Sequence, residues 1–176
     1  MKWSEKLIGS HLSRFFEDKY LCMVPNCGWT GSECDILVVT EKLKIIDVEI
    51  KISRSDFKAD AKKDKWVEGW SADSGIRWQD YHGDARLRRQ WPRKVWKHYY
   101  CIPESIWDDS LLEFRGSQAS GVILIYGEPA SPRLRLHRSA TPDRSAQAIT
   151  PESAMHIARL ASLRMWDAYR KLEQRQ

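Results

Sequence analysis

Three charged side chains alternate with apolar ones in the segment Asp47-Val48-Glu49-Ile50-Lys51. Because side chains of a β-strand point to opposite faces with a period of two, Asp47, Glu49 and Lys51 are expected on one face. Charged groups on an inner strand are costly to bury unless they are paired, bind a metal or lie at a cleft. The segment therefore predicts a polar site on one face of a sheet.

A further carboxylate, Asp35, begins an apolar run fourteen residues before Glu49. A turn predicted at Glu41-Lys42 makes a hairpin of the two runs and brings Asp35 within reach of Glu49. Carboxylate oxygens bind Mg²⁺ or Mn²⁺, and the backbone carbonyl of Ile50 offers another oxygen. The Lys51 ammonium can orient or deprotonate a water and offset charge developing on phosphorus. Together these groups predict a site for phosphodiester hydrolysis.

The elements that would position these residues follow from hydrophobic periodicity and turn chemistry. We expect helices over residues 3–18, 53–65 and from 151 onward, and strands over 20–25, 34–40, 43–52, 95–103, 121–126 and 133–138. This order, α-β-β-β-α-β-β-β-α, predicts an α/β protein with a mixed sheet flanked by helices. No repeat or linker divides the 176 residues, so one domain over 1–176 is expected.

The pattern Asp35…Glu49-x-Lys51 resembles that of the PD-(D/E)xK nuclease superfamily, with Cys34 in place of the usual proline. The sequence from residue 47 to 60, Asp-Val-Glu-Ile-Lys-Ile-Ser-Arg-Ser-Asp-Phe-Lys-Ala-Asp, looks like the strand-to-helix signature of the MmcB-like DNA-repair proteins and their phage relatives. The resemblance covers residues 5–140, most closely at 35–60.

The resemblance implies a restriction-endonuclease-like fold, an α-β-β-β-α-β core with extra strands. The segment 66–96 is then a basic and aromatic insertion, and 151–176 forms a C-terminal helix. It also implies a metal-dependent deoxyribonuclease with Mg²⁺ or Mn²⁺ as cofactor, acting in DNA repair, recombination or phage DNA metabolism. The implied catalytic residues are Asp35, Glu49, Lys51 and Glu5, and the implied metal ligands are Asp35, Glu49, Glu5 and the Ile50 carbonyl.

Glu5 enters this set because a glutamate on the first helix of the superfamily commonly helps to hold the metal. It lies on the same predicted helical face as the apolar residues that should pack on the sheet. Glu17 is the rival, closer in sequence to Asp35 but near the predicted end of the helix. We favour Glu5, and the sequence alone leaves both open.

The net charge of +5 and the isoelectric point near 9.0 make the chain modestly basic, and this overall charge does not identify a partner. The distribution of the basic residues is more informative, and the resemblance suggests DNA as the partner. Basic residues concentrate between positions 77 and 97, where they alternate with aromatic residues. The candidate phosphate-binding residues are Arg54, Lys58, Lys62, Lys65, Arg86, Arg88, Arg89 and Arg93. Such contacts would position a nucleic acid without reading its sequence. Trp78, Tyr81, Trp91 and Trp96 could stack on bases, although packing within the protein is the more ordinary role.

Two alternatives remain: a non-catalytic nucleic-acid-binding protein of the same fold, and an interaction module with zinc held by Cys22, Cys27, Cys34 and His11. The loose spacing of these cysteines disfavours zinc.

No apolar run approaches the length of a membrane span, and the first residues lack the apolar core of a secretion signal. A cytoplasmic location is therefore expected; the resemblance implies a bacterium or a phage-infected host and places a homodimer among the partners considered. No motif of an NTPase, serine esterase or cysteine protease is present.

Overall fold

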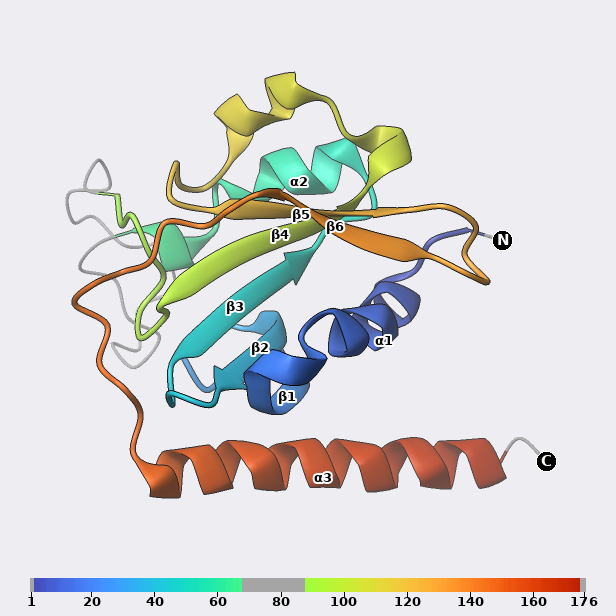
Figure 1. Ribbon diagram of the computed structural model, residues 1–176, viewed down its shortest axis with the longest axis vertical. Helices are drawn as coiled ribbons and strands as arrows, with labels where there is room; N and C mark the ends of the chain where they lie inside the picture. Colours follow the sequence, from blue (N-terminus) through green and yellow to red (C-terminus); the bar gives the residue numbers. More distant parts are fainter. Residues whose placement is uncertain (1, 68–87, 175–176) are drawn as a thin grey trace.

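The computed structural model describes residues 2–67 and 88–174, and a six-stranded sheet forms its centre (Figure 1). The strands lie side by side in chain order: β1 (Tyr20–Cys27), β2 (Cys34–Thr40), β3 (Ile45–Ile50), β4 (Lys97–Pro103), β5 (Gly121–Tyr126) and β6 (Arg133–Arg138). The central pairs β3–β4 and β4–β5 are parallel, whereas the outer pairs are antiparallel. The expected α/β class with a mixed sheet is confirmed.

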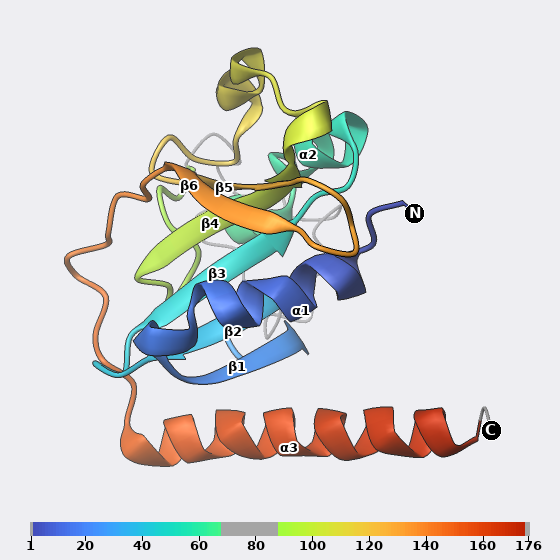
Figure 2. The ribbon, with the colours of Figure 1, turned by 45° about the vertical axis from the view of Figure 1, so that its right-hand side comes forward.

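Among the described residues, three α-helices flank the sheet: α1 (Glu5–Phe15), α2 (Arg54–Asp60) and α3 (Pro151–Glu173). Each begins after a hydroxyl side chain that accepts a hydrogen bond from the first turn, namely Ser4, Ser53 and Thr150. Helix α1 covers one face of the sheet. Helix α2 lies on the opposite face, and α3 runs beside β1 (Figures 1 and 2). In the part of the chain that the structure describes, no helix is both long and apolar enough to span a membrane.

Helix α2 is shorter than the 53–65 helix expected from the sequence. It ends at Asp60 and is followed by a 3-10 turn, η2 (Asp64–Trp66). Lys62 and Lys65, which the sequence-based expectation placed within this helix, therefore lie beyond its end. The physical reason is that Lys65 turns back over β3, where its buried ammonium pairs with carboxylates.

The two faces of the sheet differ in chemistry. Under α1 the packing is apolar, with Ile8 and Leu12 of the helix against Val48 and Ile50 of β3. The opposite face carries two apolar clusters. One lies at β1 and β2, where Ile157 of α3 packs, and the other at β4 and β5, where α2 packs. The polar side chains of β3 lie between these clusters.

Gly116 provides a test of the packing around η2. A Cβ atom built on Gly116 would lie 2.1 Å from Cε2 of the buried Trp66 ring. We expect Gly116→Ala to lower the free energy of unfolding by about 1–3 kcal/mol, because the indole must shift in a close-packed site. Gly28→Ala is the control, since a Cβ there meets no atom within 4 Å. Urea denaturation followed by circular dichroism measures both, and equal midpoints would contradict the packing around Trp66.

Candidate active site

The charged residues of β3 occupy one face of the strand, as the alternation predicts. Asp47, Glu49 and Lys51 are all buried on the face opposite α1, whereas Val48 and Ile50 point into the apolar core beneath α1. Strand β3 is an inner strand between β2 and β4, which explains this burial. Buried charges of this kind persist only where partners compensate them.

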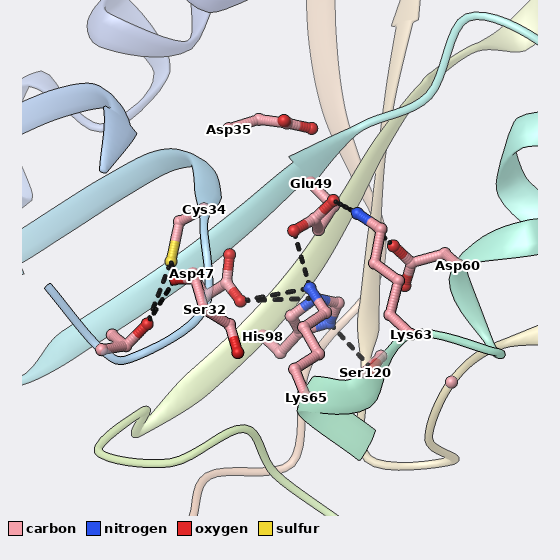
Figure 3. Close-up of polar contacts among 12 residues, drawn as sticks. Ser32, Cys34, Asp35, Asp47, Glu49, Asp60, Lys63, Lys65, His98 and Ser120 are labelled. Atoms are coloured by element: carbon pink, nitrogen blue, oxygen red, sulfur yellow. Dashed lines mark hydrogen bonds and ion pairs between the residues drawn. The ribbon is translucent and has the colours of Figure 1, made fainter. Parts of the chain in front are cut away.

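Glu49 is surrounded by the ammonium groups of three lysines, of which Figure 3 labels Lys63 and Lys65. Its Oε2 lies 2.8 Å from Nζ of Lys51 and 2.8 Å from Nζ of Lys63, and its Oε1 lies 2.7 Å from Nζ of Lys65. Although burial raises the pKa of Glu49, the charges of these lysines outweigh it and lower the pKa to about 2. Glu49 is therefore ionised throughout the physiological range.

Asp60, at the end of α2, completes the pairing of the lysines. Its Oδ1 lies 3.2 Å from Nζ of Lys51 and 3.0 Å from Nζ of Lys63. Its Oδ2 accepts hydrogen bonds from the Tyr100 hydroxyl, at 2.6 Å, and from Nε1 of Trp66, at 3.3 Å. Burial raises the pKa of Asp60, but the surrounding lysines lower it below its ordinary value. The short helix α2 thus holds the Lys51 ammonium between two fixed carboxylates.

Glu49, Asp60 and their lysine partners form one end of a buried charged cluster. The other end of this cluster contains Asp47, Lys65, His98 and Ser120. Nζ of Lys65 lies 3.4 Å from Oδ2 of Asp47 and 3.3 Å from Nε2 of His98. Burial and the charge of Lys65 lower the pKa of His98, so its ring is neutral. Because an ammonium only donates, Nε2 must accept, and Nδ1 donates to the Ser120 hydroxyl at 2.9 Å. Oδ1 of Asp47 is buried without a hydrogen-bond partner among the described residues, and burial raises the pKa of this carboxyl.

Asp35 lies at the start of β2, on the side of Glu49 away from Lys65 (Figure 3). The pairing of β2 with β3 begins at Ile36 and Val48, so Asp35 lies one step beyond it, opposite Glu49. Its Oδ2 accepts the backbone N–H of Ile50 at 2.7 Å. Burial and the charge of Glu49 raise the pKa of Asp35 to about 6. The structure thus places Asp35 against the backbone between Glu49 and Lys51.

Asp35 and Ile50 line a cavity of about 920 Å³ together with Glu5, which is exposed in the first turn of α1. Glu17, the rival first-helix acid, lies after α1 in a 3-10 turn (Glu17–Lys19) and is not among the residues of this cavity. The structure therefore favours Glu5 over Glu17 as the acid beside Asp35.

A divalent cation fits the donor types of this cavity, where Asp35 and Glu5 supply hard carboxylate oxygens. The repulsion of Asp35 by Glu49 is also the kind of interaction that a cation would relieve. Glu49 can contribute an oxygen to such a site only if the cation displaces one of its three lysine partners. Lys63 is the exposed one of the three, with 43% of its side-chain surface accessible. Across residues 2–67 and 88–174, no three His, Cys, Asp or Glu side chains are gathered closely enough to enclose a metal.

The residues expected to bind phosphate are dispersed. The structure buries Lys65, so in this conformation it is not available at the surface, which corrects its assignment. Arg54 is exposed and donates through Nε to the Ile106 carbonyl, and Lys58 lies over the Phe114 ring. Lys62 and Arg93 are also exposed, Arg89 is half-buried, Arg88 donates to the carbonyls of Ala61 and Gly116, and Arg86 lies outside the described residues.

The aromatic and cysteine residues singled out in the sequence have roles within the fold where the structure describes them. Trp91 donates through Nε1 to the Thr141 carbonyl, and Trp96 packs against the apolar core. Trp78 and Tyr81 lie outside the described residues. Cys27 and Cys34 are buried in the apolar cluster with Ile157 of α3, whereas His11 lies on α1 across the sheet. The zinc arrangement with His11 is therefore not formed.

Comparison with known proteins supports the fold of this chain but gives no information about its function. No protein-family model and no curated protein sequence matches the chain. A solved structure, the SPO1766 protein of unknown function from Silicibacter pomeroyi, is similar in fold. The match covers 94% of this chain and 87% of that one, with a TM-score of 0.50 and 18% sequence identity. The function must therefore be argued from the site.

Sequence reasoning missed several members of the cluster: Asp60, Lys63, His98 and Ser120. Asp60, at the end of a short helix, and Ser120, before β5, carry no local pattern that would reveal them. His98 carries such a signal, because it is the second residue of a strand whose next five residues are apolar or aromatic. A lone histidine of this kind predicts a buried hydrogen bond, which is the role that it has here.

Proposed function

We propose that the chain is a divalent-metal-dependent nuclease that hydrolyses phosphodiester bonds of DNA on a restriction-endonuclease-like fold. The supporting observation is the hydrogen bond from the Ile50 N–H to the Asp35 carboxylate, since it joins Asp35 to the Glu49-x-Lys51 segment across two strands. The opening of Asp35 onto a cavity is consistent with access by a substrate. The resemblance of residues 47–60 to MmcB-like proteins is the reason to expect a role in DNA repair, recombination or phage DNA metabolism.

Asp35, Glu49 and the Ile50 carbonyl would hold Mg²⁺ or Mn²⁺, with Glu5 completing the site. When bound, the cation polarises a phosphate oxygen and lowers the pKa of a bound water. Lys51 orients the attacking water and offsets the negative charge that develops on the phosphate. Asp60 positions Lys51, because its Oδ1 lies 3.2 Å from the ammonium that also pairs with Glu49.

The test is cleavage of labelled single-stranded, duplex and branched DNA in Mg²⁺, in Mn²⁺ and in EDTA. We expect cutting in at least one metal and none in EDTA, with the preferred DNA ranked by rate. A protein that binds these DNAs but cuts none of them in either metal contradicts the proposal.

Matched variants in the same assay test the role of Glu5. We expect Glu5→Gln to reduce the rate about tenfold or more, because it removes one charge from the cavity that contains Asp35. Glu17→Gln makes the same chemical change in an exposed turn and should leave the rate unchanged. Equal rates for both variants would remove Glu5 from the site.

A second function is favoured by one observation: both oxygens of Glu49 are already paired with lysines. A non-catalytic DNA-binding protein that retains the fold would have this arrangement permanently, as a structural element. It predicts salt-sensitive DNA binding, no cleavage in any metal, and binding that Asp35→Asn leaves unchanged.

A further inference from the structure

The C-terminal half of α3 lines the same cavity as Asp35 and Glu5. Arg164, Arg170 and Lys171 project from this half of the helix around the cavity. In both ribbon views the C-terminal end of α3 lies on the same side of the molecule as the N-terminal end of α1, where Glu5 is located (Figures 1 and 2). The cavity thus combines the carboxylates of Asp35 on β2 and Glu5 on α1 with basic side chains and the Asp167 carboxylate of α3.

The basic side chains of Arg170 and Lys171 can exchange their present carboxylate partner for the phosphate groups of a nucleic acid. Arg170 and Lys171 both pair with Asp167, at 3.2 and 2.7 Å; the two basic side chains are largely exposed, whereas Asp167 is half-buried. Exposed pairs within a helix contribute little stability, so phosphate oxygens can replace Asp167 at little cost. Arg164 donates instead to the Asn26 carbonyl, which ties α3 to the end of β1.

An aromatic pair lies next to the basic groups. Trp166 and Tyr169 are 56% and 54% exposed, with ring centroids 5.9 Å apart. Trp166 and Arg170 are four residues apart, so they are neighbours on the helix surface. The N-terminal half of α3 buries Ile157 in an apolar cluster, whereas this half presents its rings to solvent. Exposed rings beside cations are suited to bases and phosphates of an unpaired strand.

We propose that the C-terminal half of α3 binds single-stranded DNA beside the active site, with phosphates on Arg170 and Lys171 and bases stacked on Trp166 and Tyr169. The polyanionic partner is chosen by charge complementarity, and a single strand is chosen over a duplex because only unpaired bases expose their faces to the rings. The choice of DNA rests on the proposed nuclease function.

The first test is fluorescence anisotropy with labelled oligothymidylate and with a duplex of equal length, in EDTA, over a series of salt concentrations. We expect tighter binding of the single strand. Arg170→Gln/Lys171→Gln should reduce the slope of log K against log salt by about 1.4, at about 0.7 for each lost phosphate contact. Arg133→Gln/Arg144→Gln, a matched pair of exposed arginines from β6 and the loop after it, should retain the wild-type slope.

The second test replaces the aromatic pair. We expect Trp166→Ala to weaken oligothymidylate binding about tenfold, because one stacking surface is lost. Wild-type affinity and slope in both α3 variants would overturn the proposal. So would a wild-type dimer that Trp166→Ala converts to a monomer with unchanged DNA binding, since the helix would then bind a second copy of the chain.

These measurements are independent of the nuclease proposal because EDTA prevents metal-dependent cleavage. Binding that depends on α3 without cleavage in any metal would sustain the α3 site and reject the nuclease. Cleavage by the Arg170→Gln/Lys171→Gln variant at the wild-type rate, with unchanged binding, would sustain the nuclease and reject the α3 site.

Discussion

Replacing Lys65 with methionine is expected to lower the free energy of unfolding by about 3–5 kcal/mol, because it removes a buried charge and leaves its partners uncompensated. Nζ of Lys65 lies 2.7 Å from Oε1 of Glu49 and 3.4 Å from Oδ2 of Asp47. Glu49 keeps two other lysines in the variant. The loss of the Lys65 charge affects Asp47 more strongly than Glu49, since Oδ1 of Asp47 already has no hydrogen bond among the described residues.

Urea denaturation at neutral pH measures this loss, and Lys63→Met is the matched control. Lys63 pairs with Glu49 at a similar distance but is 43% exposed, so water can replace it and the cost should stay below about 1 kcal/mol. Adding Asp47→Asn to Lys65→Met should restore part of the stability, because it removes the unpaired carboxylate. Equal losses for the two lysines would contradict the buried ion-pair description.

Asp35→Asn is expected to reduce DNA cleavage at least about 100-fold without lowering stability. Loss of cleavage is expected because the variant removes a charged oxygen ligand proposed for the metal. Stability should be retained because an asparagine side-chain oxygen can still accept the Ile50 N–H. The variant also removes a charge that the fold disfavours, as the raised pKa of Asp35 shows. Above pH 6 the free energy of unfolding should therefore stay the same or rise, by up to about 2 kcal/mol.

Cleavage in Mg²⁺ and urea denaturation at pH 8 are measured on the same preparation. A fully active variant would exclude Asp35 from the reaction. A variant that loses both activity and stability would instead indicate that Asp35 has a structural role.

Much of the fold was predictable because it depends on local patterns. Alternation over residues 45–50 determined the strand and placed Asp47, Glu49 and Lys51 on one face. The short connection between β2 and β3 made an antiparallel hairpin the only nearby pairing, and this brought Asp35 opposite Glu49. The length of α2 was not predictable, because the pairing of Lys65 with buried carboxylates, rather than helix propensity, decides where that helix ends.

The sequence by itself determined the mixed α/β class, the order of helices and strands along the chain and the meeting of Asp35 with the Glu49-x-Lys51 segment, since each follows from periodicity and short-range connection. Only the tertiary structure decided which groups compensate the buried charges. Asp60 and Lys63 come from the segment after β3, and His98 comes from β4. The position of α3 beside the cavity was likewise decided by packing of Ile157 on the far side of β1 and β2. Contacts of this kind depend on which elements pack together, and a linear pattern carries no information about that.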